Sequence, residues 1–267
     1  MKKFILQNPP DSRGIIYLKE NDFHYLVRIR RLGVGSVFKA FLPDGNEKEL
    51  EIISVKNQVL KAQCKEDALL HTCFKSKEGI SENTIPPIYL LQALPKGSKM
   101  DLIVRQACEC GILRIIPFFS EYSQVKNKAK GAYTEKAKRW NRIIKEARQQ
   151  SGSAVQTKIN EPCDFDKAVL FWEQLNKEKA CGVGIFFHEQ SKRPGTLHDC
   201  LGDNPDFVVM AVGPEGGFSP AEAECFEKAG FKSMALGDNI LRTETAALYG
   251  AAAIRIILSE RASWQKK

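Results

Sequence analysis

The stretch that decides the fold is FVVMAV at 207–212, followed directly by GPEGGF at 213–218. Six apolar residues in a row, with no polar alternation, are typical of a strand buried on both faces of a helix-covered parallel sheet. After the glycines, Ser219 has the position of an N-cap, Pro220 that of the first helical residue, and Glu222 that of the reciprocal member of a capping box. The sequence therefore predicts a strand, a glycine turn and a helix start in succession. Such a turn serves either as a ligand cradle or simply as a tight connection.

A second loop of the same kind follows. FKSMAL at 231–236 predicts another short strand, Gly237 to Asn239 break it, and residues 240–245 lead into an alanine-rich helix from about Thr245 to Leu258. In an open parallel sheet, ligands bind beyond the carboxyl ends of the strands, so the two loops can converge on one pocket. Neither loop has the spacing of a phosphate-binding or dinucleotide-binding motif. A pocket of backbone and leucine or isoleucine side chains suits a neutral, nucleoside-like cofactor better than a triphosphate.

The rest of the chain divides into two regions with different patterns. Residues 1–72 are rich in short strands, of which the clearest are 37–42, 50–55 and 59–64, and they predict a small β-barrel. A polar segment punctuated by Gly and Pro, residues 73–87, predicts a linker. Residues 88–267 alternate strands and helices, which indicates an α/β domain with a mainly parallel sheet. The expected elements before the two loops are strands at 88–93, 112–118 and 183–187, and helices at 100–110, 135–150 and 165–176.

Composition limits the class of protein. The chain has 267 residues, 43% of them hydrophobic, and contains no apolar run near the ~18–20 residues that span a bilayer. We therefore expect a soluble, cytoplasmic protein with no membrane partner, because the N-terminus also lacks a signal-peptide core. The eight cysteines form no CxxC pair and have no metal-ligand spacing with the four histidines. They are expected to be reduced thiols, and no metal site is predicted.

The positive charge is concentrated in one segment. The net charge is +8, and residues 126–148 hold nine Lys or Arg residues against two acids, a local excess of +7. A solvated helix face is the alternative explanation of any charge run. Neighbouring aromatic residues at 122, 133 and 140 favour a nucleic-acid surface, since phosphates bind cations and unpaired bases stack on aromatic rings. The predicted RNA contacts are Lys138, Arg139 and Arg142 here, and Arg28, Arg30 and Arg31 on a short helix at 21–32, for which an ordinary exposed helix is an equal alternative.

The two glycine loops also resemble a known family. The motifs at 213–219 and 236–246, with KGSKMDLIV at 96–104 and the segment 139–152, resemble bacterial 16S ribosomal RNA methyltransferases that methylate N3 of a uridine and belong to the SPOUT superfamily. The resemblance covers nearly the whole chain. It implies a SPOUT domain with a C-terminal trefoil knot at 88–267, a PUA-like RNA-binding barrel at 1–72, and S-adenosyl-L-methionine as cofactor. It also implies a homodimer that acts on small-subunit ribosomal RNA or on the assembled small subunit.

The resemblance assigns roles to residues of both loops. Arg242 is the first choice to stabilise the uracil anion, with a helix cap or a salt bridge to Glu244 as the alternative. Glu215 either orients the base, accepts its proton or holds the loop by hydrogen bonds. His24 and His188 receive no catalytic role. The expected cofactor-binding residues are Gly213, Gly216, Leu236, Gly237, Ile240 and Leu241.

Four positions depart from the resembled pattern. Tyr122 and Ser153 stand where the family usually has Arg, Lys2-Lys3 stand for an N-terminal Arg, and Ser36 replaces an Asp. These changes remove bidentate phosphate geometry or charge, so they affect the expected RNA docking more than cofactor binding. The leading hypothesis is an RNA uridine N3-methyltransferase. The alternative is a non-catalytic RNA-binding protein on the same scaffold, and a small-molecule methyltransferase is disfavoured by the basic segment.

Overall fold

The computed structural model describes residues 4–6, 8–42, 47–65, 85–124, 133–179, 181–189, 195–203 and 205–264. The chain forms two compact units, one of residues 1–79 with 148–154, the other of residues 80–147 with 155–267. The described part of each unit holds its own buried apolar residues. Most of the predicted linker lies outside the described residues, and so does the segment 43–46, whose Pro-Asp-Gly-Asn sequence predicts a turn. The boundaries at 72 and 88 therefore stay a prediction.

The first unit contains a five-stranded sheet with the order β1-β3-β4-β5-β2. The three predicted strands are present, and β4 and β5 are joined by Asn57 and Gln58, both at positive φ (49° and 58°), which suits a tight hairpin. The helix predicted at 21–32 ends at Ile29, and its second part, from His24, is a π-helix. Among the described residues, the two outer strands of this order, β1 and β2, are not paired with each other, and β1 is parallel to β3. The elements are β1 (Phe4–Ile5), β2 (Ile15–Leu18), α1 (Glu20–Phe23), η1 (His24–Ile29), β3 (Val37–Phe41), β4 (Glu47–Lys56) and β5 (Val59–Cys64).

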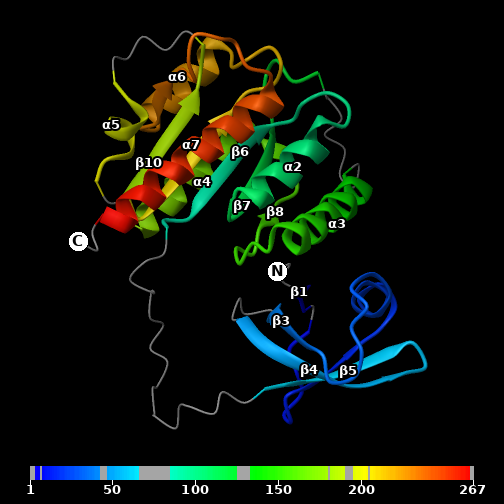
Figure 1. Cartoon of the computed structure of the whole chain (residues 1–267). Coiled ribbons are helices and arrows are strands. Elements are labelled where there is room, and N and C mark those ends of the chain that lie inside the picture. Colours follow the sequence, from blue (N-terminus) through cyan, green and yellow to red (C-terminus); the bar gives the residue numbers. More distant parts are fainter. Residues whose placement is uncertain are drawn as a thin grey trace. The chain divides into compact units, whose positions relative to one another are not determined.

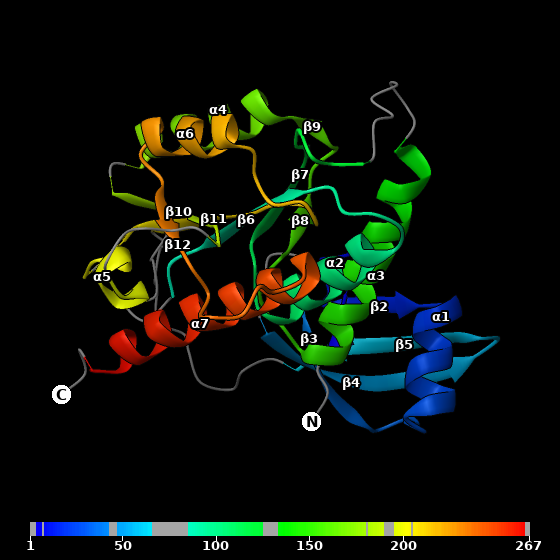
Figure 2. The same ribbon diagram turned by 90° about the horizontal axis from the view of Figure 1, so that it is seen from above.

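The second unit is built on a parallel sheet with the order β12-β10-β11-β6-β7-β8, and β9 also pairs with β7. Figure 1 shows β10, β6, β7 and β8 of this sheet, and Figure 2 labels all of its strands. All of its strand pairs are parallel, as predicted. Two-residue strands β8 and β9 were not expected, because such short segments carry no readable pattern. The strands are β6 (Ile88–Ala93), β7 (Arg114–Phe119), β8 (Lys158–Ile159), β9 (Cys163–Asp164), β10 (Gly182–Phe187), β11 (Phe207–Val212) and β12 (Lys232–Met234).

Helices cover both faces of this sheet (Figure 2). Strand β11 explains why: Val208, Met210 and Val212 face one core, while Phe207 and Val209 face the other. A strand between two apolar layers must be apolar at every position, which is why its sequence shows no alternation. One layer consists of α2 (Lys99–Glu109), α3 (Thr134–Ser151), α5 (Leu197–Leu201) and α7 (Thr243–Trp264), and the other of α4 (Phe165–Glu178) and α6 (Pro220–Lys228).

The two helices that follow the glycine loops begin as their sequences indicate. Ser219 caps α6, Pro220 is its first residue, and the capping box with Glu222 is complete. Helix α7 begins at Thr243, two residues before the predicted start. A methyl group added at Gly250 would lie 2.3 Å from the ring of Phe187, so α7 packs directly against β10. Packing within the subunit therefore explains why position 250 is a glycine. In the described part of the chain, no helix is long and apolar enough to cross a membrane.

Candidate functional site

The two glycine loops enclose a cavity of about 660 Å³ in the second unit. It lies at the carboxyl ends of β10, β11 and β12, where a parallel sheet places its ligands. The last residue of β10, Phe187, and the residue after it, His188, add to its wall, a contribution that sequence reasoning missed. All of the predicted cofactor and catalytic residues line it: Gly213, Glu215, Gly216, Leu236, Gly237, Ile240, Leu241 and Arg242.

Three glycines of the cavity wall disfavour side chains, two because of close neighbours and one because of its backbone conformation. A methyl group at Gly213 would lie 3.1 Å from the backbone carbon of Gly217, and one at Gly216 would lie 3.1 Å from Cβ of Tyr122. Gly237 has a φ of +111°, which residues with side chains rarely adopt. The cavity wall is therefore backbone on these stretches, with apolar side chains such as Leu236 beside it.

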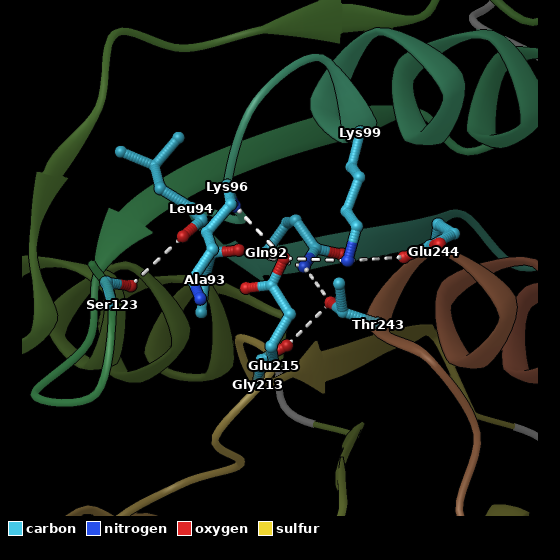
Figure 3. A network of polar contacts seen from close by, with 10 residues as sticks. All are labelled: Gln92, Ala93, Leu94, Lys96, Lys99, Ser123, Gly213, Glu215, Thr243 and Glu244. Atoms are coloured by element: carbon cyan, nitrogen blue, oxygen red, sulfur yellow. Dashed lines mark hydrogen bonds and ion pairs between the residues drawn. The ribbon is translucent and has the colours of Figure 1, made fainter. Parts of the chain in front are cut away.

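A buried polar network ties the first loop to the sheet and to α7 (Figure 3). Thr243, the first residue of α7, donates a hydrogen bond from its hydroxyl to the carbonyl of Gly213 over 2.7 Å. The same hydroxyl accepts one from Nε2 of Gln92 over 3.1 Å, and Nε2 also donates to the carbonyl of Ala93. Gln92 is fully buried at the end of β6. The only sequence signal for this network is a glutamine in an otherwise apolar strand.

Lys99 joins both loops through two carboxylates (Figure 3). Its ammonium group lies 2.8 Å from Oε1 of Glu215 and 3.5 Å from Oε2 of Glu244, and the backbone N–H of Lys96 also donates to Glu215. Partial burial opposes ionisation of Glu215, but the hydrogen bonds from Lys99 and the backbone outweigh it and lower the pKa of this carboxyl. The hydrogen bond to Glu215 raises the pKa of Lys99. These contacts fit the loop-holding role for Glu215 and make it a weaker base than an ordinary glutamate.

Arg242 lies at the cavity immediately before α7. Its carbonyl accepts the first helical hydrogen bond from Ala246, so its backbone occupies the cap position. Its side chain is exposed and forms no hydrogen bond or ion pair within the part of the chain that the structure describes. Glu244, the alternative salt-bridge partner, instead pairs with Lys99. The guanidinium group is therefore available to a ligand in the cavity.

A second network fixes the turn after β7 against α6. The buried carboxylate of Glu222 accepts hydrogen bonds from the hydroxyl of Ser120 and the N–H of Glu121, each over 2.9 Å. The hydroxyl of Ser123 donates to the carbonyl of Leu94. Tyr122 lies within this turn and lines the cavity, although its side chain is 45% exposed.

The predicted RNA contacts on α3 are all in ion pairs. Lys138 pairs with Glu135 and Arg142 with Glu146, between side chains that are at least 63% exposed. Exposed pairs of this kind contribute little, so these cations can exchange their partners for phosphates. Arg139 pairs with the largely buried Asp101 of α2, and this pair holds the two helices together. Three further lysines of the basic segment, at 126, 128 and 130, lie outside the described residues.

Two of the neighbouring aromatics do not serve the expected surface. Trp140 is 2% exposed and belongs to the core, and the Tyr133 hydroxyl is buried without a hydrogen-bond partner among the described residues. The expectation that Trp140 could stack on bases is therefore wrong, because its position on α3 faces the sheet. In the first unit, Arg28 and Arg31 are exposed, and Arg30 is half-buried.

Comparison with known protein families gives two matches. Residues 81–255 match the family described as RNA methyltransferase domain, and residues 18–61 match the family described as RNA methyltransferase PUA domain. The Ribosomal RNA small subunit methyltransferase E of Bacillus subtilis is 31% identical over 245 residues, which cover 87% of this chain and 86% of that protein. Its counterpart in Mesomycoplasma hyopneumoniae is 33% identical over 174 residues, covering 64% and 71%.

Solved structures share the fold over nearly the whole chain. The Ribosomal RNA small subunit methyltransferase E from Neisseria gonorrhoeae, solved bound to S-adenosyl methionine, superposes with a TM-score of 0.74 at 23% identity and covers 96% of this chain and 98% of its own. A putative methyltransferase from Legionella pneumophila, solved with the same cofactor, gives 0.73 at 24% identity, covering 96% and 97%. At these identities the likeness concerns the fold.

Proposed function

Since this chain belongs to the RNA methyltransferase family, we propose that it transfers a methyl group from S-adenosyl-L-methionine to N3 of a uridine in small-subunit ribosomal RNA. Relatives at 31% and 33% identity carry the name of a small-subunit ribosomal RNA methyltransferase. The observation that carries the proposal is the cavity, because all of the residues chosen for cofactor and catalysis line it. We also propose a cytoplasmic location, because the proposed target is ribosomal RNA.

The cavity fits the cofactor in size and chemistry. A volume of about 660 Å³ lies in the range of small-molecule sites. Backbone groups at Gly213 and Gly216 approach the ligand without side chains between them, while Leu236 and Leu241 supply apolar contact. When bound, S-adenosyl-L-methionine supplies an electrophilic methyl group on a sulfonium centre. The residues of this chain have to hold it and bring a deprotonated uracil nitrogen in line with it.

Arg242 is the proposed catalytic residue. N3 of uracil carries a proton and is a weak acid, so the reaction needs its anionic form. A guanidinium group that is exposed at the cavity and has no described ion-pair partner stabilises that anion electrostatically. The proton leaves N3 before the methyl group is transferred, which produces the anion that Arg242 stabilises. The lowered pKa of Glu215 argues for solvent as the acceptor, with Glu215 orienting the loop through Lys99.

RNA docking is assigned to both units. We propose residues 1–72 as the PUA-like RNA-binding domain, residues 73–87 as linker and residues 88–267 as the catalytic domain. The family matches at 18–61 and 81–255 support a division into two domains, and the second match begins within the proposed linker. Arg28, Arg30 and Arg31 contribute phosphate contacts from the first. Lys138 and Arg142 contribute them from the second, since their exposed ion pairs exchange readily. The partner is small-subunit ribosomal RNA, free or assembled.

A trefoil knot and a homodimer complete the proposal. Strand β12 lies at the sheet edge beyond β10, and α7 then returns to β6, β11 and α2. The proposed knot rests on the family resemblance, and this return of α7 is compatible with it. For the homodimer, the support is Tyr249 and Ile256, which are 54% and 57% exposed and lie two turns apart on one face of α7.

Two measurements test the function. Calorimetry should detect S-adenosyl-L-methionine binding, and incubation with tritiated cofactor should label small-subunit ribosomal RNA at a uridine located by sequencing. Gly216→Val is the control, since its side chain would meet Tyr122 and fill the cavity wall; it should bind no cofactor while the first unit stays folded. Cofactor binding without any RNA labelling would leave a cofactor-binding protein that is not this methyltransferase. Absence of cofactor binding in the unmodified protein would leave an RNA-binding protein.

A further inference from the structure

One aromatic side chain at the cavity is not used by the fold. Tyr122 follows β7, and its side chain is 45% exposed while it lines the wall formed by Gly216 and Gly217. The residues around it are fixed: Ser120 and Ser123 are buried, and each is held by a side-chain hydrogen bond to another segment. The hydroxyl of Tyr122 makes no hydrogen bond to any residue in the described ranges. A rigid turn therefore presents an aromatic ring to solvent at the edge of the cofactor cavity.

Packing does not account for this ring. The contact with Gly216 is made by Cβ of Tyr122, at 3.1 Å from where a methyl group on Gly216 would lie, and the nearest ring atoms are 3.7 Å from that point. An alanine would supply the same Cβ. Trp140 is buried in the core and Tyr133 is half-buried beneath Lys136, whose ammonium lies 4.8 Å from the Tyr133 ring. Of the three aromatics near the basic segment, Tyr122 is the one with a free face.

A base that enters such a cavity loses its stacking partners in the RNA, and an aromatic ring can replace them. To bring a ring nitrogen to a methyl donor, the base must leave its stacked position, which costs stacking energy. Stacking on a protein aromatic restores this energy and requires no particular base edge, so the hydrogen-bonding edge stays free to face the reaction. A phenol ring is uncharged and planar, and it competes with neither the guanidinium of Arg242 nor the phosphate-binding cations of α3, which follows Tyr122 along the chain.

From this geometry we infer that Tyr122 is the base-stacking residue of the enzyme, its ring covering one face of the uracil that receives the methyl group. The inference rests on the proposed function and names how the same site holds its substrate. The other occupant of that ring face would be the adenine of the cofactor. We choose the RNA because Tyr122 directly precedes the basic segment 126–148, which supplies the proposed phosphate contacts, and the cofactor Kd of the variants below decides between the two occupants.

Three variants test it. Tyr122→Ala keeps the Cβ against Gly216 and removes the ring, whereas Tyr122→Phe and Tyr122→Trp keep a stacking surface. With tritiated S-adenosyl-L-methionine and either naked small-subunit ribosomal RNA or assembled small subunits, Tyr122→Ala should lower kcat/KM roughly 5- to 100-fold, the scale expected when one base–aromatic stack is removed. The Phe and Trp variants should stay within about threefold of the unmodified enzyme, and the cofactor Kd should be unchanged in all three.

The outcomes separate this inference from the proposed function. Full activity of Tyr122→Ala would overturn the stacking role. Weaker cofactor binding by this variant would also overturn it, because the ring would then stack on the adenine of the cofactor and not on the uracil. Equal losses in the Ala, Phe and Trp variants also overturn it, since they would mean that the hydroxyl or the turn is what matters. If the unmodified protein labels no RNA, the proposed function fails, and filter binding of the same RNA decides the stacking role: Ala weakening and Phe retaining affinity supports it, and equal affinities overturn it.

Discussion

Replacing Thr243 by Val tests how the first glycine loop, the proposed cofactor loop, is held. Valine has nearly the shape of threonine but no hydroxyl, and Thr243 is only 4% exposed. The change removes the 2.7 Å hydrogen bond to the carbonyl of Gly213 and the 3.1 Å hydrogen bond from Nε2 of Gln92. Nε2 keeps its bond to the carbonyl of Ala93, so the amide is not left without an acceptor. The carbonyl of Gly213 loses its side-chain donor in a buried position.

The expected cost follows from these contacts. A net hydrogen bond contributes about 1 kcal/mol, and a buried group left unsatisfied costs about 1–3 kcal/mol, so Thr243→Val should destabilise the second unit by about 2 kcal/mol. Gln92→Leu should cost less, about 1 kcal/mol, because it also removes Oε1, which has no hydrogen-bond partner among the described residues. In the double variant, Thr243→Val breaks only the bond to Gly213. The two changes should therefore couple by about 1 kcal/mol.

The stabilities of the unmodified protein, the two single variants and the double variant can be measured by urea unfolding, with tryptophan fluorescence as the signal. All three tryptophans, Trp140, Trp172 and Trp264, belong to the second unit, so the signal does not report on the first. Cofactor affinity should fall in Thr243→Val, since the carbonyl of Gly213 is no longer fixed, and change less in Gln92→Leu. Strictly additive single-variant costs, or a Thr243→Val cost below about 0.5 kcal/mol, would refute the network as the support of this loop.

Three further predictions concern charge. Arg242→Ala should lower single-turnover methylation by on the order of 10²-fold or more, with partial recovery at higher pH, because more uracil then ionises unaided. Replacing Lys138 and Arg142 together by Ala should reduce the slope of log affinity for RNA against log salt, as measured by filter binding, by roughly one unit for each phosphate that the protein no longer neutralises. The Lys99–Glu215 pair should contribute its full stability above the ordinary glutamate pKa of 4.5, and this contribution should disappear as pH falls through the lowered pKa of Glu215. The difference in urea midpoint between the unmodified protein and Lys99→Met should therefore shrink in acid.

Each of these predictions has a control. Arg242→Lys keeps the charge and should retain part of the activity, and a defect explained by reduced cofactor affinity would contradict a catalytic role. Arg139→Ala should lower stability by breaking its pair with Asp101, whereas the Lys138 and Arg142 changes should not. An unaltered salt slope would mean that these two residues are only a solvated surface. A pH-independent difference between wild type and Lys99→Met would remove the ion pair as its cause.

The fold was readable where local pattern and tertiary environment agree. The continuous apolar run of β11 and the Ser219–Glu222 capping box predicted a buried strand and a helix start, and both are confirmed. Elements β8 and β9 were not readable, because two residues carry no periodicity and owe their extended conformation to pairing with β7. Helix α7 begins earlier than its alanines indicate, since hydrogen bonds to Gln92 and Gly213 fix Thr243.

The sequence predicted residues that line the cavity but not how their side chains contact one another. Both glycine loops could be placed at one sheet edge, because parallel strands share their carboxyl ends. Lys99 was visible only within a longer motif, and its ion pairs link positions far apart in the sequence. The burial of Trp140 depends on which face of α3 meets the sheet, and the charge count of the segment could not decide that. The roles of Arg242 and Glu215 in catalysis stay predictions.

The contact between Gly250 and Phe187 constrains how this sequence can evolve. A methyl group at Gly250 would fall 2.3 Å from the Phe187 ring, so an alanine there requires this ring to move or to be replaced by a smaller side chain. Phe187 also lines the cofactor cavity, and its replacement would enlarge that cavity before any gain in helix propensity from the alanine. Either route to an alanine at position 250 therefore alters the wall of this cavity. Lineages that keep the phenylalanine should keep the glycine.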